Sequence, residues 1–143
     1  MRHVLLVEDN PLNQALVEDI FRDDNLPGEL VCVESAEEAL RILPSIEPLV
    51  VLMDLRLPGM SGIEATKVIK GDPATNHVRV WAITARNARS DIDEALAAGC
   101  DGYFTKPVNR PHLVEQLRVI GSEDVLNLVH QTVEPAHEHD PAD

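Results

Sequence analysis

The sequence predicts an α/β fold: a three-layer, doubly wound domain with a five-stranded parallel sheet between two layers of helices. Short apolar runs of strand length alternate with segments that carry apolar residues at helical spacing. The run at residues 49–53 is apolar without a break, which is typical of a strand buried on both faces. The 143 residues suit one domain with its own core, and aliphatic side chains must fill it because only 3% are aromatic.

The apolar runs are predicted as strands because turn residues bracket them. Leu49 to Met53, followed by Asp54, lies between Pro48 and Pro58, and the run is too short for a helix. The predicted strands are residues 4–7, 30–33, 49–53, 78–84 and 102–105.

Capping residues indicate where the first two helices begin. Asn10 and Pro11 open the first helix, since proline suits the first helical position. Ser35, followed three residues later by Glu38, forms a capping box that begins the second helix. Pro44 is expected to stop this helix because proline cannot donate a backbone hydrogen bond.

Similar signals predict the three later helices. Ser61 begins the third, and Ser90 caps the fourth, with Asp91 among the acidic residues in its first turn, where the helix dipole favours them. Pro111 begins the fifth, which is expected to end near Ile120.

The chain is expected to divide into a domain at residues 1–121 and an appendage at residues 122–143. The appendage begins with a short helix to about Thr132 and ends in an acidic tail that is predicted to be disordered. His137 and His139 lie in this tail, where two histidines rarely make a specific metal site.

Composition excludes several classes of function. The formal net charge of −13 argues against direct nucleic-acid binding and against anionic membrane surfaces, both of which need basic residues. Cys32 and Cys100 match no metal or redox spacing and are expected to be reduced thiols. No signal peptide or membrane span is visible, so a cytoplasmic protein is expected.

The predicted strand ends place reactive side chains along one edge of the sheet. In open α/β sheets this carboxyl edge is where ligands bind. Three neighbouring carboxylates would repel each other and raise their pKa values, and a hard cation such as Mg²⁺ relieves that repulsion. With an ammonium and a hydroxyl nearby, this arrangement suits phosphoryl transfer to a carboxylate. Each residue alone has an alternative explanation as a helix cap or surface charge. The residues are Glu8, Asp9, Asp54, Thr84 and Lys106.

Four segments together resemble the receiver domain of two-component response regulators: VLLVEDN, LMDLRLPGMSG, AITA and GYFTKPV. The resemblance covers about residues 3–120. It implies a flavodoxin-like sheet with strand order 2-1-3-4-5, which the alternation alone does not give. It also implies a phosphorylation-activated signalling switch that accepts its phosphoryl group from a histidine kinase or a histidine phosphotransfer protein.

The resemblance assigns roles to the residues of the acidic site. Asp54 matches the phosphoacceptor. Asp9 matches a direct ligand of Mg²⁺, for which Mn²⁺ is a substitute, and Glu8 matches a ligand that acts through water. Arg56 would contribute its backbone carbonyl to the metal. Lys106 matches the phosphate-binding lysine, and the peptide bond that follows it is cis in the family.

The resemblance also assigns switch and rate-tuning positions. Thr84 matches the switch hydroxyl, and Tyr103 matches the aromatic residue that changes rotamer with it. Arg56 and Arg86, two residues beyond Asp54 and Thr84, match positions that tune dephosphorylation. Their guanidinium groups are expected to obstruct the water that would hydrolyse the phosphoryl group. The alternatives are that their charge stabilises the transition state of hydrolysis, or that both side chains point into solvent and have no effect.

Other functions remain as alternatives. A Mg²⁺-dependent phosphatase or phosphotransferase of the haloacid-dehalogenase type would need a second aspartate two residues after the nucleophile, where this chain has Arg56. A degenerate receiver would lack part of the site, and every position is filled here. A stand-alone receiver is expected, and the receiver of a hybrid histidine kinase is the alternative context. The VEDNPLNQ opening and the Gly99-Cys100 pair before the fifth strand are similar to those of single-domain cell-cycle regulators and of hybrid-kinase receivers.

The output is expected to be protein docking rather than catalysis by an attached domain. About two dozen residues follow the receiver, too few for an effector domain. The downstream target is expected to bind the face formed by the fourth helix, fifth strand and fifth helix. A monomer or a weak phosphorylation-dependent dimer is expected.

Overall fold

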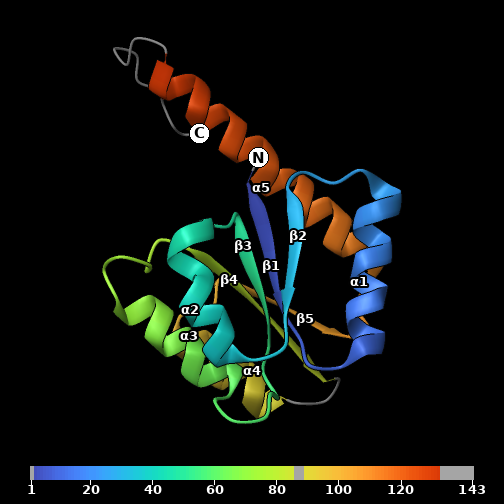
Figure 1. Ribbon diagram of the computed structural model, residues 1–143, viewed down its shortest axis with the longest axis vertical. Coiled ribbons are helices and arrows are strands. Elements are labelled where there is room, and N and C mark those ends of the chain that lie inside the picture. Colours follow the sequence, from blue (N-terminus) through green and yellow to red (C-terminus); the bar gives the residue numbers. More distant parts are fainter. Residues whose placement is uncertain (1, 86–88, 133–143) are drawn as a thin grey trace.

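The computed structural model, which describes residues 2–85 and 89–132, has one parallel five-stranded sheet with helices on both faces (Figure 1). The strand order β2-β1-β3-β4-β5 confirms the predicted fold class and topology. The strands are β1 (His3–Val7), β2 (Glu29–Val33), β3 (Val50–Asp54), β4 (Arg79–Ala85) and β5 (Gly102–Lys106). The helices are α1 (Pro11–Asp24), α2 (Ala36–Ile46), α3 (Gly62–Gly71), α4 (Arg89–Ala98) and α5 (Arg110–Thr132).

Two apolar clusters hold the helices against the sheet because successive strand residues point to opposite faces. Leu5 and Met53 belong to the cluster that packs α2, α3 and α4 on one face. Leu6 and Leu52 belong to the cluster that packs α1 and α5 on the other. All four side chains are fully buried, so the central strands are fixed from both sides. The strand ends that carry the acidic residues are therefore held in place.

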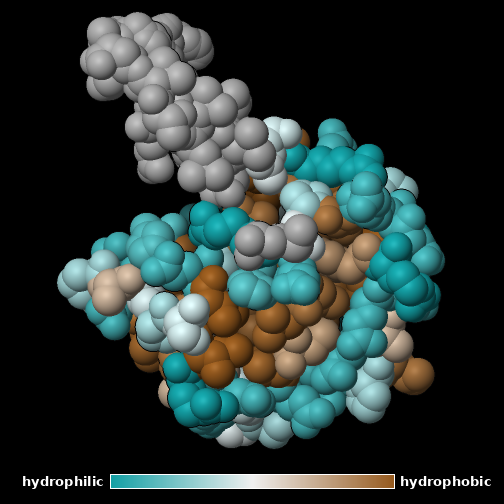
Figure 2. Space-filling view, turned by 45° about the horizontal axis from the view of Figure 1, so that its top comes forward, coloured by the Kyte–Doolittle hydropathy of each residue, from teal (hydrophilic) through white to brown (hydrophobic). Residues whose placement is uncertain are grey.

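The β2 edge of the sheet is less well covered. Among the described strands, β2 pairs with β1 alone, and its residues Leu30, Val31 and Cys32 are half-buried. Figure 2 shows an area of apolar side chains bordered by polar ones on the face that it displays. The well-packed centre of the sheet, rather than this edge, positions the site.

The second helix does not stop at Pro44 as predicted. α2 runs to Ile46, and Pro44 lies in its last turn, where the missing N–H removes one hydrogen bond without ending the helix. The helix ends at Glu47, whose left-handed backbone has φ of 44° and whose N–H donates to the Leu43 carbonyl at 3.1 Å.

The fourth helix also begins earlier than predicted. α4 starts at Arg89, so Ser90 lies inside its first turn instead of capping it. A serine at that position is tolerated because its short side chain does not prevent helical backbone geometry.

The predicted break between the fifth helix and a separate helix at residues 122–132 is wrong. α5 continues from Arg110 to Thr132, and its end projects beyond the sheet (Figure 1). Gly121 lies within α5, where its lack of a side chain leaves room for Pro27: a Cβ there would lie 2.6 Å from the ring Cγ. Residues 133–143, with His137 and His139, lie outside the described residues, and the domain boundary stays a prediction.

The helices within residues 2–85 and 89–132 lack the combination of length and apolar character that a bilayer-spanning helix needs.

The start of α3 packs directly on the end of β3. A Cβ on Gly62 would overlap the carbonyl oxygen of Asp54 and lie 2.9 Å from its carbonyl carbon. Gly62→Ala is therefore expected to destabilise the domain by about 2 kcal/mol, because backbone atoms would have to move.

Gly71 at the other end of α3 is the matched control. A Cβ there would meet nothing within 4 Å, so Gly71→Ala should be neutral or stabilising by up to about 1 kcal/mol. Urea denaturation of both variants measures the difference. Equal unfolding midpoints would show that α3 does not depend on this close approach.

Candidate functional site

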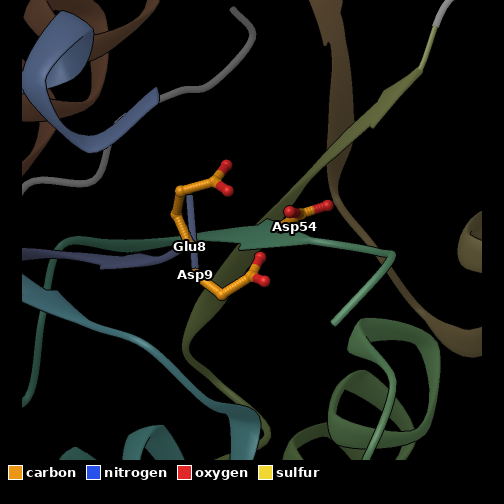
Figure 3. A group of neighbouring side chains, drawn as sticks. All are labelled: Glu8, Asp9 and Asp54. Carbon is orange, nitrogen blue, oxygen red and sulfur yellow. The ribbon is translucent and has the colours of Figure 1, made fainter. Parts of the chain in front are cut away.

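Three carboxylates meet at the carboxyl edge of the sheet. Glu8 and Asp9 follow β1, and Asp54 ends β3. Figure 3 shows their side chains grouped at the ends of these two strands, and one carboxylate oxygen from each of the three lies within 4.8 Å of the others. Glu8 and Asp54 are each 2% exposed, whereas Asp9 is exposed to solvent. The predicted convergence of the acidic residues is confirmed.

The turn after β1 fixes the Glu8 side chain. The Glu8 N–H donates to the Val33 carbonyl at 3.0 Å, which extends the ladder beyond β1. The Asn10 N–H donates to Glu8 Oε2 at 3.0 Å, and Gln14 Nε2 donates to the Glu8 carbonyl at 2.6 Å. Asn10 in turn caps α1 by accepting from the Leu12 N–H at 2.8 Å. The start of α1 is thus joined to the acidic pair.

Lys106 is the cation of the site. Its Nζ lies 3.0 Å from Asp54 Oδ2 and 3.2 Å from Glu8 Oε1, so one ammonium contacts both buried carboxylates. The peptide bond between Lys106 and Pro107 is cis, as expected. The Arg56 N–H donates to the other oxygen of Asp54, Oδ1, at 3.0 Å. The sequence predicted Lys106 as the phosphate-binding residue, and the structure adds that its ammonium also pairs with Glu8.

The electrostatics of the site are dominated by burial. Burial raises the pKa of Asp54, and the Glu8 charge raises it further, although the Arg56 N–H and Lys106 oppose this. Burial alone would lower the pKa of Lys106, but its hydrogen bond and attraction to Asp54, with a contribution from Glu8, raise the pKa instead. Among the described residues at this edge, the three carboxylates outnumber the one ammonium, so their charges sum to a negative value.

The donor set fits a hard divalent cation. Carboxylate and carbonyl oxygens are the ligands that Mg²⁺ prefers, usually together with retained waters. Asp9 is exposed and able to ligate directly, whereas both oxygens of Glu8 already accept hydrogen bonds. Asp54 and the Arg56 carbonyl complete the candidate ligands. An ion here would reduce the repulsion among the carboxylates.

Thr84 and Tyr103 lie at different depths in this structure. Thr84 Oγ1 is buried and has no hydrogen-bond partner among the described residues. Thr84 pairs with Thr105 in the sheet, while Tyr103 pairs with Ala82 and is 43% exposed. A buried hydroxyl without a partner is unusual and suits a ligand or side-chain movement that would satisfy it.

The Arg56 side chain points away from the acidic site toward α4. Its Nε lies 2.7 Å from Asp91 Oδ2, and this ion pair joins the loop after β3 to the first turn of α4. The hydrogen bond and charge of Asp91 raise the pKa of the Arg56 guanidinium. The second predicted rate-tuning residue, Arg86, lies outside the described residues.

The sequence did not indicate that two residues of other helices hold the loop after Asp54. Glu37 of α2 accepts from the Met60 N–H at 3.0 Å, and that hydrogen bond lowers the pKa of Glu37. Asp91 of α4 binds Arg56 from the other side. Acidic residues in the first turn of a helix are expected from the helix dipole alone, so the sequence explains Glu37 and Asp91 without the loop. Only the tertiary contacts show that both residues also hold the loop.

Comparison with known proteins places this site in a known context. The family model described as response regulator receiver domain matches residues 4–118. The polar-differentiation response regulator DivK of Brucella ovis is 34% identical over 117 residues, which are 82% of this chain and 94% of that protein.

Two solved structures are similar in fold and sequence. The first is the receiver domain of sensor histidine kinase PA1611 from Pseudomonas aeruginosa PAO1, with a magnesium ion in its active-site cleft. It has a TM-score of 0.75 and 31% identity over 85% of this chain and 98% of that one. The second is the co-crystal structure of the Saccharomyces cerevisiae histidine phosphotransfer signalling protein Ypd1 and the receiver domain of Ssk1. It has a TM-score of 0.76 and 33% identity over 86% of this chain and 90% of that one.

The raised pKa of Asp54 predicts a stabilising substitution. A carboxyl group whose pKa is higher in the folded state than in the unfolded state favours folding while it is protonated. That stability is lost as the pH rises through the folded-state pKa, because the ionised carboxylate is disfavoured in the folded state. In metal-free buffer at pH 7, Asp54→Asn should therefore stabilise the protein by roughly 1 kcal/mol or more.

This gain should shrink as pH falls toward about 4, where the unfolded carboxyl also becomes protonated. Thermal unfolding across this range measures it. Asp72→Asn is the control, because Asp72 is exposed and accepts a hydrogen bond from the Ala74 N–H at 2.9 Å. The side-chain amide oxygen of asparagine can accept the same hydrogen bond. A gain that is constant with pH would contradict the role of Asp54 ionisation.

Proposed function

This chain belongs to the response regulator receiver domain family, and on that premise we propose that Asp54 is the residue that accepts its phosphoryl group. The domain is a signalling switch of a phosphorelay. The observation that carries the assignment to Asp54 is its buried carboxylate, which lies 3.0 Å from Lys106 and within 4.8 Å of the Glu8 and Asp9 carboxylates.

The transfer is a displacement at phosphorus. A carboxylate oxygen of Asp54 forms the new bond, the bond from phosphorus to the donor histidine nitrogen breaks, and the electron pair stays on the imidazole. Asp9 and Asp54 would hold Mg²⁺ directly, with the Arg56 carbonyl as a third ligand and Glu8 acting through water. The bound ion would neutralise charge on the phosphoryl oxygens. Mn²⁺ suits the same oxygens.

Lys106 and Thr84 would hold the phosphoryl oxygens. The Lys106 ammonium already lies at Asp54 Oδ2, so it reaches a group attached there. The Thr84 hydroxyl, buried without a partner among the described residues, would gain an acceptor. Movement of Thr84 would open space for Tyr103, which is exposed in this structure. The Thr84–Tyr103 pair is therefore the proposed switch.

The proposed phosphoryl donor is a histidine kinase or a histidine phosphotransfer protein. The co-crystal structure of Ypd1 with the Ssk1 receiver supports this class of partner. Apolar surface is available beside the site at the start of α1, where Leu12 is 79% exposed and Leu16 is 40% exposed. Leu16 also lines a small hollow together with Glu8 and Lys106. A donor seated there would have its histidine close to Asp54.

The proposed output is docking of a target protein on the face formed by α4, β5 and α5. A hollow of about 420 Å³ lies on the part of this face formed by β5 and the start of α5, lined by residues that include Tyr103, Thr105 and His112. Because Tyr103 lines it, a rotamer change would alter its shape. The chain would then act without turnover of a separate substrate, and Arg56 supplies no general acid for one.

Acetyl phosphate with Mg²⁺ is expected to add one phosphoryl group to the chain. Asp54→Asn should abolish the addition, because the amide oxygen is a poor nucleophile. Intact-mass spectrometry measures the stoichiometry. Asp93→Asn, which changes an exposed carboxylate on α4, should be phosphorylated like the original chain. Persistent labelling of Asp54→Asn would refute the assignment.

Removal of the exposed acidic ligand should weaken metal binding. Asp9→Asn is expected to lower the affinity for Mg²⁺ by roughly tenfold, since a charged ligand is lost, and to slow phosphorylation in parallel. Titration calorimetry measures the affinity. Asp19→Asn on the exposed face of α1 is the control. Unchanged affinity in Asp9→Asn would place the metal elsewhere.

A further inference from the structure

The first turn of α4 depends on one side chain from another part of the chain. Of the ten residues of α4, Asp91 and Ala95 are buried. The Asp91 side chain is only 12% exposed, and its carboxylate pairs with Arg56 of the loop after β3 at 2.7 Å. A buried carboxylate is stable when it is paired in this way.

Arg56 connects this helix to the phosphoacceptor. Its backbone N–H donates to Asp54 Oδ1 at 3.0 Å, while its guanidinium binds Asp91. The side chain is 74% exposed, so no packing prevents it from moving. Glu94 of α4 adds attraction for the guanidinium. One residue therefore contacts both Asp54 and the buried acid of α4.

A phosphoryl group on Asp54 would compete with Asp91 for this guanidinium. It brings a charge of about −1.5 to −2 and three strong acceptor oxygens. Arginine binds such oxygens in bidentate fashion, and its planar group is suited to this geometry. The competing Asp91 carboxylate carries one charge and is engaged through Nε.

We propose that Asp91 is a positioning residue that holds the Arg56 guanidinium away from Asp54 until phosphorylation, when Arg56 transfers to the phosphoryl oxygens and releases the first turn of α4. This inference rests on the proposed function of Asp54. After the transfer, Asp91 is a buried carboxylate without its cation, so the seating of α4 weakens. Because such coupling is reciprocal, a partner that displaces the first turn of α4 would also favour binding of the Arg56 guanidinium to the phosphoryl group.

A double-mutant cycle separates this role from that of a helix-capping acid. Asp91→Asn, Arg56→Gln and the double variant are phosphorylated with acetyl phosphate, and loss of the phosphoryl group is followed after donor removal. Asp91→Asn should slow the loss by about threefold, because a released Arg56 obstructs the water. In the Arg56→Gln background, Asp91→Asn should have no effect.

Hydrogen exchange of the α4 amides gives the second readout. Phosphorylation of the original chain should speed exchange in the first turn of α4, and unphosphorylated Asp91→Asn should already exchange faster, each by about two- to fivefold. Asp93→Asn, on the same helix and paired with Arg89, is the control and should behave like the original chain.

The outcomes separate the two claims. If Asp54 takes no phosphoryl group, the proposed function fails. If Asp54 is phosphorylated but Asp91→Asn alters the lifetime equally with and without Arg56, Asp91 only supports the helix and this inference fails. Unchanged α4 exchange on phosphorylation of the original chain would overturn it as well.

Discussion

The contact of Lys106 with Asp54 and Glu8 is the interaction on which the site depends. Two carboxylates that are each 2% exposed would be strongly destabilising without a cation, and Lys106 Nζ lies 3.0 and 3.2 Å from them. The parallel strands all end at one edge of the sheet, and the order β2-β1-β3-β4-β5 places β1 directly beside β3, so that Glu8 and Asp54 are neighbours there. The negative charge that remains makes the same edge suitable for a metal ion and, with it, for a phosphoryl group.

The parts of the fold and site that the sequence predicted are those fixed by local pattern. Buried strands read as unbroken apolar runs, so the residues that follow them, such as Asp54 and Lys106, were placed at the correct edge. The direction of the Arg56 side chain was not predictable, because Arg56 lies in an exposed loop and its partner Asp91 follows 35 residues later. The end of the fifth helix was predicted near Ile120 for a similar reason: the local sequence does not show that α5 continues to Thr132, with Gly121 in close contact with Pro27.

The loop after Asp54 links the site to the helices around it. Glu37 of α2 holds it through the Met60 N–H, and Asp91 of α4 holds it through Arg56. A change of charge on Asp54 therefore acts on a segment that is attached on two sides. Of the two attachments, the ion pair with α4 is the one a phosphoryl group would compete for, because its cation is exposed and belongs to the residue whose backbone N–H binds Asp54. This explains how a local event at one carboxylate would alter the surface of a helix.

The central claim is that the buried carboxylate of Asp54 is the phosphoacceptor. The most direct measurement is borohydride reduction of the acetyl-phosphate-treated chain, which converts an acyl phosphate to an alcohol, followed by peptide mapping with mass spectrometry. We expect homoserine at position 54, formed only when both Mg²⁺ and the phosphoryl donor are present. Reduction at another carboxylate, with Asp54 unmodified, would contradict the assignment.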